Sequence, residues 1–194
     1  MTAFNLTFNY FKHKYPGSRK VRDLAEDELG FIRANFPGDV EAFFAEEGVC
    51  SYADGYFHFV SPWTALAIPP RFLMSPQEHL VFLRTAFGDF FTWNGSRVSL
   101  MRVAMGRLSE MSDDMTVFFK FALGDADFVD QSMYRRLYEP ARARLGELDC
   151  DECFGSTTDS LPFRGGKPIH LIRKFKWLDY LDAWAGAHHP KPAP

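Results

Sequence analysis

The spacing of apolar residues changes along the chain, from a helical period to a strand-like period and back again. In the first fifty residues, apolar side chains recur every three or four positions, as on one face of a helix. Two such faces consist of Phe4, Phe8 and Phe11, and of Leu24, Leu29 and Ile32. A further helix is predicted over 40–47, with Asp39 as its N-cap and Gly48 as its C-terminal stop.

Four stretches between residues 55 and 101 have the composition of strands. They are rich in aromatic and β-branched residues and are bounded by turn residues. They cover residues 55–60, 80–85, 90–93 and 97–101. Asn94-Gly95 separates the last two, and this dipeptide is a strong hairpin signal. Short turns between consecutive strands predict an antiparallel sheet.

The helical period returns in the second half of the chain. A helix capped by Asp113 or Asp114 is predicted to close at Gly124. Its apolar residues are Val117, Phe118, Phe121 and Ala122. A longer helix is predicted over 132–145, with Gly146 as its stop, and Pro140 within it marks either a kink or a helix start.

The last part of the chain adds a strand over 169–175 and a helix over 177–185. The fold class that this order predicts is α+β: an antiparallel sheet covered by helices, with a helical C-terminal lobe from about residue 107 packed on it. The proline-rich tail, residues 188–194, is expected to be disordered.

Composition narrows the class of protein without identifying it. The 194 residues suit one domain or two docked lobes, and 21 Phe need a large core or an interface. A net charge of −3 does not favour direct binding of nucleic acid. The chain has no apolar stretch long enough to span a membrane and no signal peptide pattern. Three cysteines are too few for a disulfide framework, and we expect a cytoplasmic protein.

The residues that often carry catalysis do not form a recognisable motif here. Cys150 and Cys153 have the spacing of half a zinc site, but a second pair is missing, and Cys50 is distant in sequence. None of the six histidines belongs to a metal-binding or nucleophile motif. We therefore expect no metal, no cofactor and no enzymatic activity.

Acidic residues are concentrated between positions 109 and 130. Six acids stand there against one base, Lys120. The acids are Glu110, Asp113, Asp114, Asp125, Asp127 and Asp130. They could form helix caps, a divalent cation site without the usual calcium-loop pattern, or an acidic patch for a basic partner. Glu46, Glu47 and Asp54 form a second, smaller cluster around the Gly48 turn.

Two ordered motifs resemble a known family. The first is Ala86-Phe87-Gly88-Asp89, which follows Phe43-Phe44-Ala45-Glu46-Glu47-Gly48. The second is Asp151-Glu152-Cys153-Phe154-Gly155, followed by Trp177-Leu178-Asp179-Tyr180-Leu181. Together they resemble a GAD-like domain followed by a Tdi-type C-terminal domain, as in immunity proteins for DNase effectors of the bacterial type VI secretion system.

The resemblance implies a GAD-like lobe over 1–106 and a Tdi-type lobe over 107–187. It also implies a non-catalytic inhibitor whose partner is a cognate DNase toxin. The motif residues are expected to be structural: Gly88 and Asp89 in one turn, and Asp151, Glu152 and Cys153 in the turn that docks the C-terminal lobe.

Three hypotheses follow for the function. The leading one is an immunity protein that covers the cationic surface of a nuclease with carboxylates and aromatic anchors. The toxin-binding candidates are Glu46, Glu47, Asp54, Tyr52, Tyr56, Asp125, Asp127 and Asp130. The alternatives are a small hydrolase or phosphoesterase that uses the Asp113–Asp130 acids or Cys153, and an adaptor without a toxin partner.

Overall fold

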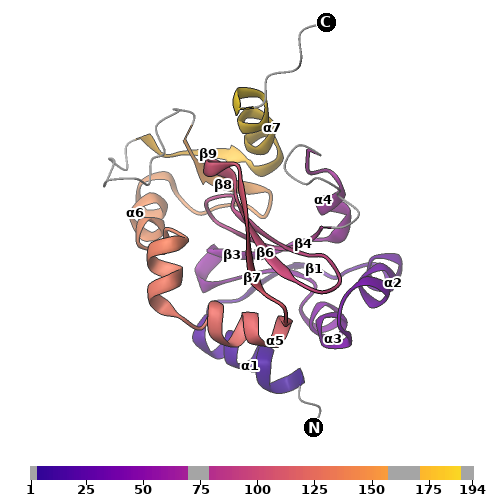
Figure 1. Ribbon diagram of the computed structural model, residues 1–194. Helices are drawn as coiled ribbons and strands as arrows, with labels where there is room; N and C mark the ends of the chain where they lie inside the picture. The colour runs from indigo at the N-terminus through magenta and orange to yellow at the C-terminus, as the bar shows by residue number, and fades with distance from the viewer. Residues whose placement is uncertain (1–3, 70–78, 157–170, 189–194) are drawn as a thin grey trace, which may run out of the picture.

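A seven-stranded antiparallel sheet forms the centre of the molecule. The computed structural model describes residues 4–69, 79–156 and 171–188. The strands lie in the sheet in their chain order, each antiparallel to its neighbours (Figure 1). They are β1 (Arg19–Arg22), β2 (Val49–Tyr52), β3 (Phe57–Phe59), β4 (Leu80–Thr85), β5 (Phe90–Trp93), β6 (Val98–Arg102) and β7 (Arg107–Ser112). A separate two-stranded sheet pairs β8 (Glu152–Gly155) with β9 (Arg173–Lys176).

The helices lie around this sheet. The α-helices are α1 (Phe4–Lys14), α2 (Glu26–Asn35), α3 (Gly38–Glu47), α4 (Pro62–Leu66), α5 (Met115–Val117), α6 (Arg135–Leu145) and α7 (Trp177–His188). The described residues also include the 3₁₀ turns η1 (Ala53–Gly55) and η2 (Val103–Met105) and the π-helical turns η3 (Phe118–Ala122) and η4 (Phe128–Ser132). No helix in the described ranges is long and apolar enough to cross a membrane.

The predicted α+β class is confirmed, as are its most local features. Asn94-Gly95 joins β5 to β6, with Trp93 opposite Val98. Gly48 and Gly146 end α3 and α6 with φ angles of 66° and 82°, which glycine adopts without steric cost.

Several predicted boundaries were wrong. Pro37, not Asp39, is the N-cap of α3, because the helix begins two residues earlier than predicted, at Gly38. Residues 107–112 begin the second half with a strand, β7, because their backbone pairs with β6. The strand predicted over 169–175 is β9, shifted to Arg173–Lys176, and residues 169 and 170 lie outside the described residues. The predicted disordered tail also lies outside them, apart from His188 at the end of α7.

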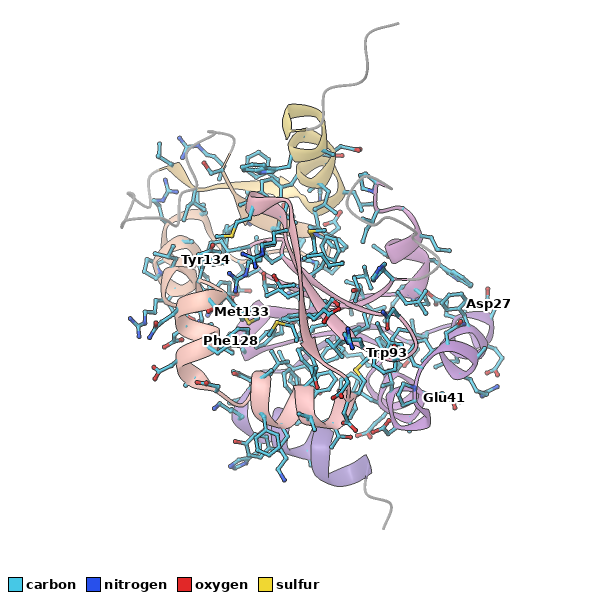
Figure 2. The ribbon with its side chains drawn as sticks, viewed as in Figure 1. Asp27, Glu41, Trp93, Phe128, Met133 and Tyr134 are labelled. Atoms are coloured by element: carbon cyan, nitrogen blue, oxygen red, sulfur yellow. The ribbon has the colours of Figure 1, made fainter. Side chains whose placement is uncertain are left out.

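The larger core lies on one face of the sheet. Phe57 and Phe59 of β3 point to this face together with Tyr52 of β2. Helix α1 places Phe11 against these rings, with centroids 5.3–5.7 Å apart. Phe8 stacks on Phe43 of α3 at 4.3 Å. The high Phe content is thus explained mostly by this buried layer. Figure 2 shows its boundary: Trp93 lies inside the molecule, whereas Asp27 lies on the outer side of α2.

The smaller core lies on the opposite face, under α7. Phe90 and Met101, which are directly opposed on β5 and β6, pack there with Trp177 and Tyr180. In Figure 1 this helix lies at the top of the molecule, beside the β8–β9 pair and opposite the end that carries α1 and α5.

The two motifs that carry the family resemblance meet at this second core. The Phe154 N–H donates to the Ala86 carbonyl at 2.7 Å, and the Trp177 indole N–H donates to the Gly88 carbonyl at 3.0 Å. Gly88 has a φ of 85°, and a Cβ there would lie 3.1 Å from the Tyr180 ring. The turn 86–89 therefore forms the seat on which β8 and α7 dock.

Asp89, Asp151 and Glu152 hold this junction through the backbone. The Asp89 Oδ1 accepts from the Val103 N–H at 2.8 Å, which ties the β4–β5 turn to the end of β6. The Asp151 carbonyl accepts from the Trp177 N–H at 2.7 Å. The Glu152 carboxylate accepts from the Asp149 N–H at 2.9 Å, which closes the turn before β8.

Candidate functional site

Two residues proposed as aromatic anchors have to be withdrawn. Tyr52 is 2% exposed and Tyr56 is 0% exposed. Tyr52 packs against Phe11 of α1, and the Tyr56 ring lies 5.4 Å from the Tyr138 ring of α6. Neither ring can reach a partner, because helices distant in sequence cover both.

Two exposed aromatic residues lie at the end of the molecule that carries α1 and α5, and a third, Trp63, lies on α4. Phe121 is 62% exposed and Tyr10 is 41% exposed, and Val117 lies in solvent close to Phe121 in sequence. Tyr10 and Phe121 line a shallow cleft of about 440 Å³ with Lys120, Gly124 and Asp125. We call Tyr10, Val117, Phe121, Asp125 and Asp127 the acidic–aromatic surface.

The backbone explains why Phe121 points outward. The predicted helix is present but irregular: α5 continues as the π-helical turn η3. Met115, Phe118 and Phe119 are buried, whereas Val117 and Phe121 are exposed. The helical periodicity had placed Phe118 and Phe121 on one face, and the wider π turn separates them. π-helical turns are rare and frequently occur at functional sites.

Two acids of this stretch hold the local backbone. The Asp114 carboxylate accepts from the Val117 N–H at 2.9 Å, so Asp114 is the N-cap of α5. This confirms one of the two residues predicted as the cap of this helix. The Asp125 Oδ1 accepts from the Asp127 and Phe128 N–H groups at 2.9 and 3.1 Å. Asp125 therefore caps the helical turn that follows it, which is one of the roles considered for these acids.

The remaining acids differ in how far their charge is compensated. Asp130 faces Arg136, with 3.7 Å between Oδ2 and Nε. Asp127 is exposed, and no ion pair joins it to another described residue. On the basic side, the Lys120 ammonium lies 5.5 Å from the centre of the Phe121 ring, and Lys14 donates to the Gly124 carbonyl. Among the described residues, neither Asp127 nor Asp125 forms an ion pair, and Lys120 lines the same cleft as Asp125.

The second predicted acidic cluster is divided by the fold. Glu46 and Glu47, at the end of α3, both pair with Lys12 of α1, and the Glu46 contact is 3.0 Å. Asp54 is exposed but lines a different cleft, with Arg142 and Glu147. Lys12 neutralises part of the charge that the sequence had left unpaired.

The described residues offer no ready site for a metal or a nucleophile. No group of three or more His, Cys, Asp or Glu side chains within these ranges is arranged to hold a metal ion. Cys50 and Cys153 are buried and Cys150 is exposed, and all three are free thiols. Burial raises the pKa of the Cys153 thiol to about 12, which keeps it protonated and weakly nucleophilic.

The geometry of the acidic–aromatic surface suits protein recognition. An exposed phenyl ring beside carboxylates can fill an apolar pocket, while the carboxylates meet basic side chains around it. Sequence reasoning found the acids but missed Tyr10 and Phe121 as the aromatic part. The neighbouring bases gave no signal, because Phe11 and Phe119 also stand next to lysines and are buried.

The fold and this surface define a small α+β protein with an antiparallel meander and a docked C-terminal helix. The GAD-like domain matches residues 6–107, so the chain belongs to the GAD-like domain family. No curated protein matches the chain in sequence. The crystal structure of Atu4351 from Agrobacterium tumefaciens has a similar fold: the TM-score is 0.71 at 17% identity, covering 95% of this chain and 94% of that one.

Proposed function

We propose that this protein is a non-catalytic immunity protein that binds and neutralises a cognate DNase toxin of the type VI secretion system. Its membership of the GAD-like family supports the proposal, together with the resemblance of its C-terminal motifs to Tdi-type domains. Because such a toxin attacks chromosomal DNA, the protein would act in the cytoplasm. The observation that carries the proposal is Phe121, which is 62% exposed and lines a shallow cleft together with Asp125.

The proposed mechanism assigns separate tasks to charge and to the aromatic rings. A nuclease exposes a cationic surface to hold phosphates, and carboxylates on an inhibitor attract that surface and accelerate encounter. Phe121 and Tyr10 would then enter an apolar recess of the toxin, and truncating such an anchor commonly costs about 2 kcal/mol of binding free energy or more. Bound in this way, the inhibitor would exclude DNA.

The experiment that tests this function uses the protein encoded beside this one. The two proteins are co-purified, and plasmid degradation by the partner is measured with and without the inhibitor. We expect a stable complex and loss of degradation. Absence of both binding and protection would refute the proposal.

A charge variant locates the contact. Asp127→Lys combined with Asp125→Asn reverses one charge and removes another, while Asn preserves the cap at position 125. We expect association to slow about tenfold or more and its salt dependence to weaken. Asp182→Lys on α7, exposed at the other end of the molecule, is the matched control and should associate like the wild type. Equal rates for the two variants would contradict binding through the acidic–aromatic surface.

A further inference from the structure

A row of polar side chains crosses four strands on the face of the sheet opposite the larger core. Direct cross-strand pairing places Arg19 of β1 beside Ser51 of β2, Ser51 beside His58 of β3, and His58 beside Arg84 of β4. Directly opposed residues of antiparallel strands lie on the same face with their Cβ atoms about 5 Å apart. The four side chains therefore form a continuous polar row.

This row continues into the smaller core, and only part of it is covered. Beyond Arg84 the same face carries Phe90 and Met101, which pack under α7. Ser51 and His58 instead border a cleft of about 350 Å³. Its other lining residues come from β1 and from the segment before β8: Arg19, Lys20, Val21, Leu148, Asp149, Cys150 and Asp151. A buried polar row thus opens into a cleft.

Two nitrogen atoms of this row lack a hydrogen-bond partner within the described part of the chain: His58 Nε2 and Arg84 Nε. His58 is 4% exposed and Arg84 is 0% exposed. The Arg84 guanidinium donates to the Cys150 carbonyl at 2.7 Å and lies 5.3 Å from the Trp177 ring centre. These contacts hold the cation without a carboxylate. Buried polar atoms without partners are uncommon, and an unseen ligand is one explanation for them.

The protonation state of His58 limits the chemistry of such a ligand. The imidazole hydrogen-bonds to the Gly55 backbone, and because Nε2 is unpartnered this bond uses Nδ1. Burial, and the nearby Arg84 charge, lower the pKa of His58 well below its usual value. The imidazole is therefore neutral, and Nε2 presents a lone pair that needs a donor.

The charges around the cleft favour an anion that carries a proton. Lys20 pairs with Asp23, and Asp151 pairs with Lys176 at 2.8 Å, so these charges largely cancel. Arg19, on β1, and Arg84, on β4, remain against the exposed Asp149 at the rim, and Glu147, which lies near Arg19, pairs with Arg142. The balance is positive, with Arg19 at the mouth and Arg84 behind His58.

We propose that this cleft binds a hydrogen phosphate group. A P–OH donates to His58 Nε2, while the unprotonated oxygens accept from the Ser51 hydroxyl and the Arg19 guanidinium. Arg84 lies behind His58 and supplies positive potential. Sulfate has a similar shape and charge but no proton at neutral pH, so it cannot satisfy Nε2.

The first test measures thermal stability with inorganic phosphate, with sulfate, and with chloride at matched ionic strength. Phosphate should raise the melting temperature by about 4 °C at ten times its dissociation constant, and sulfate should do no more than chloride. Methyl phosphate separates a bound ester from free phosphate. It should bind at pH 5.5 and weaken at pH 8, where the ester has lost its proton, whereas inorganic phosphate keeps a P–OH at both values. Equal effects of sulfate and phosphate would overturn the proposal.

Two variants place the effect in this cleft. Arg19→Gln alters an exposed side chain, and His58→Phe removes Nε2 while keeping a ring. Each should weaken phosphate binding at least tenfold, with circular dichroism confirming the fold. Arg97→Gln, at the β5–β6 turn, removes an exposed arginine elsewhere and should leave binding unchanged. Wild-type affinity in Arg19→Gln would overturn the proposal whether or not His58→Phe folds. These measurements need no toxin, so their result is independent of the proposed function.

Discussion

At the scale of single residues, two buried carboxyl groups respond to pH in opposite directions. Glu28 is surrounded by donors: Arg22 at 2.7 and 2.8 Å, the Ala25 N–H at 2.9 Å and the Ser61 hydroxyl. Asp89 receives one hydrogen bond, at Oδ1, and its Oδ2 has no partner among the described residues. Donors stabilise the charged form of Glu28, whereas burial penalises the charged form of Asp89.

Glu28 is expected to stabilise the fold above pH 4.5. The Arg22 guanidinium, together with Ser61 and the Ala25 N–H, lowers the pKa of Glu28 from 4.5 to about 2. The folded state therefore holds fewer protons than the unfolded chain between these values, and stability is lost as the pH falls through them. Because Arg22 is half-exposed, Glu28→Gln should lower the free energy of unfolding by only about 2 kcal/mol at pH 7. Urea unfolding at pH 7 and pH 3 measures this, and an equal loss at both would contradict it.

Asp89 should produce the opposite slope in a higher pH range. Burial raises the pKa of Asp89 from 3.8 to about 7. The folded state then holds a proton that the unfolded chain has lost, so stability falls as the pH rises from 3.8 to 7, by up to about 1.4 kcal/mol per pH unit. Asp89→Asn should be less sensitive to pH over this range while keeping the acceptor for the Val103 N–H. Urea unfolding at pH 5 and pH 7.5 tests this, and an unchanged slope in the variant would show that Asp89 is charged in the fold.

At the scale of elements, local chemistry predicted the features that depend on few neighbours. Asn94-Gly95 predicted the β5–β6 hairpin, and Gly48 and Gly146 predicted the ends of α3 and α6. Strand β1, with the sequence Arg-Lys-Val-Arg, and the exposed strand β7 carry no apolar alternation. They are strands because their backbones pair with β2 and β6, which no local pattern encodes.

The packing of α7 against the turn 86–89 can be tested with two glycines that share a backbone conformation. Gly88 and Gly95 have φ angles of 85° and 90°, so alanine is strained at both. A Cβ at Gly88 would lie 3.1 Å from the Tyr180 ring, whereas none of the described atoms lies within 4 Å at Gly95. Gly88→Ala should therefore cost about 1–3 kcal/mol more than Gly95→Ala. Thermal unfolding of both variants measures the difference, and equal costs would mean that α7 does not depend on this turn.

At the scale of the whole molecule, the acids of the candidate site could be predicted but the aromatic anchors could not. Asp125 and Asp127 were found because unbalanced charge is visible in the sequence. Tyr52 was misjudged because α1 and α3, far away in sequence, cover it. Phe121 was misjudged because a π-helical turn changes which side chain faces the core, and no periodicity of 3.6 residues reports that change.

The fold also explains why Glu46 and Glu47 are weaker candidates for toxin binding than Asp127. Both glutamates pair with Lys12 of α1, which brings a base from distant sequence to their side. Asp127 gains no such ion pair among the described residues. A partner that approaches the end of the molecule carrying α1 and α5 would meet Phe121 and Asp125 in one cleft, with the exposed Asp127 two residues further along the chain.

The central claim, that Phe121 anchors the toxin, is tested most directly by the dissociation rate of the complex. Phe121→Ala is compared with Trp63→Ala, which removes another exposed aromatic, on α4 at a distant site. Because Phe121 is largely solvent-exposed, its loss should change the free energy of unfolding by no more than about 0.5 kcal/mol. We predict that Phe121→Ala dissociates from the nuclease about 30-fold faster than the wild type, as expected for an anchor worth about 2 kcal/mol, and that Trp63→Ala dissociates at the wild-type rate. Equal dissociation rates for Phe121→Ala and the wild type would contradict the assignment of the binding surface.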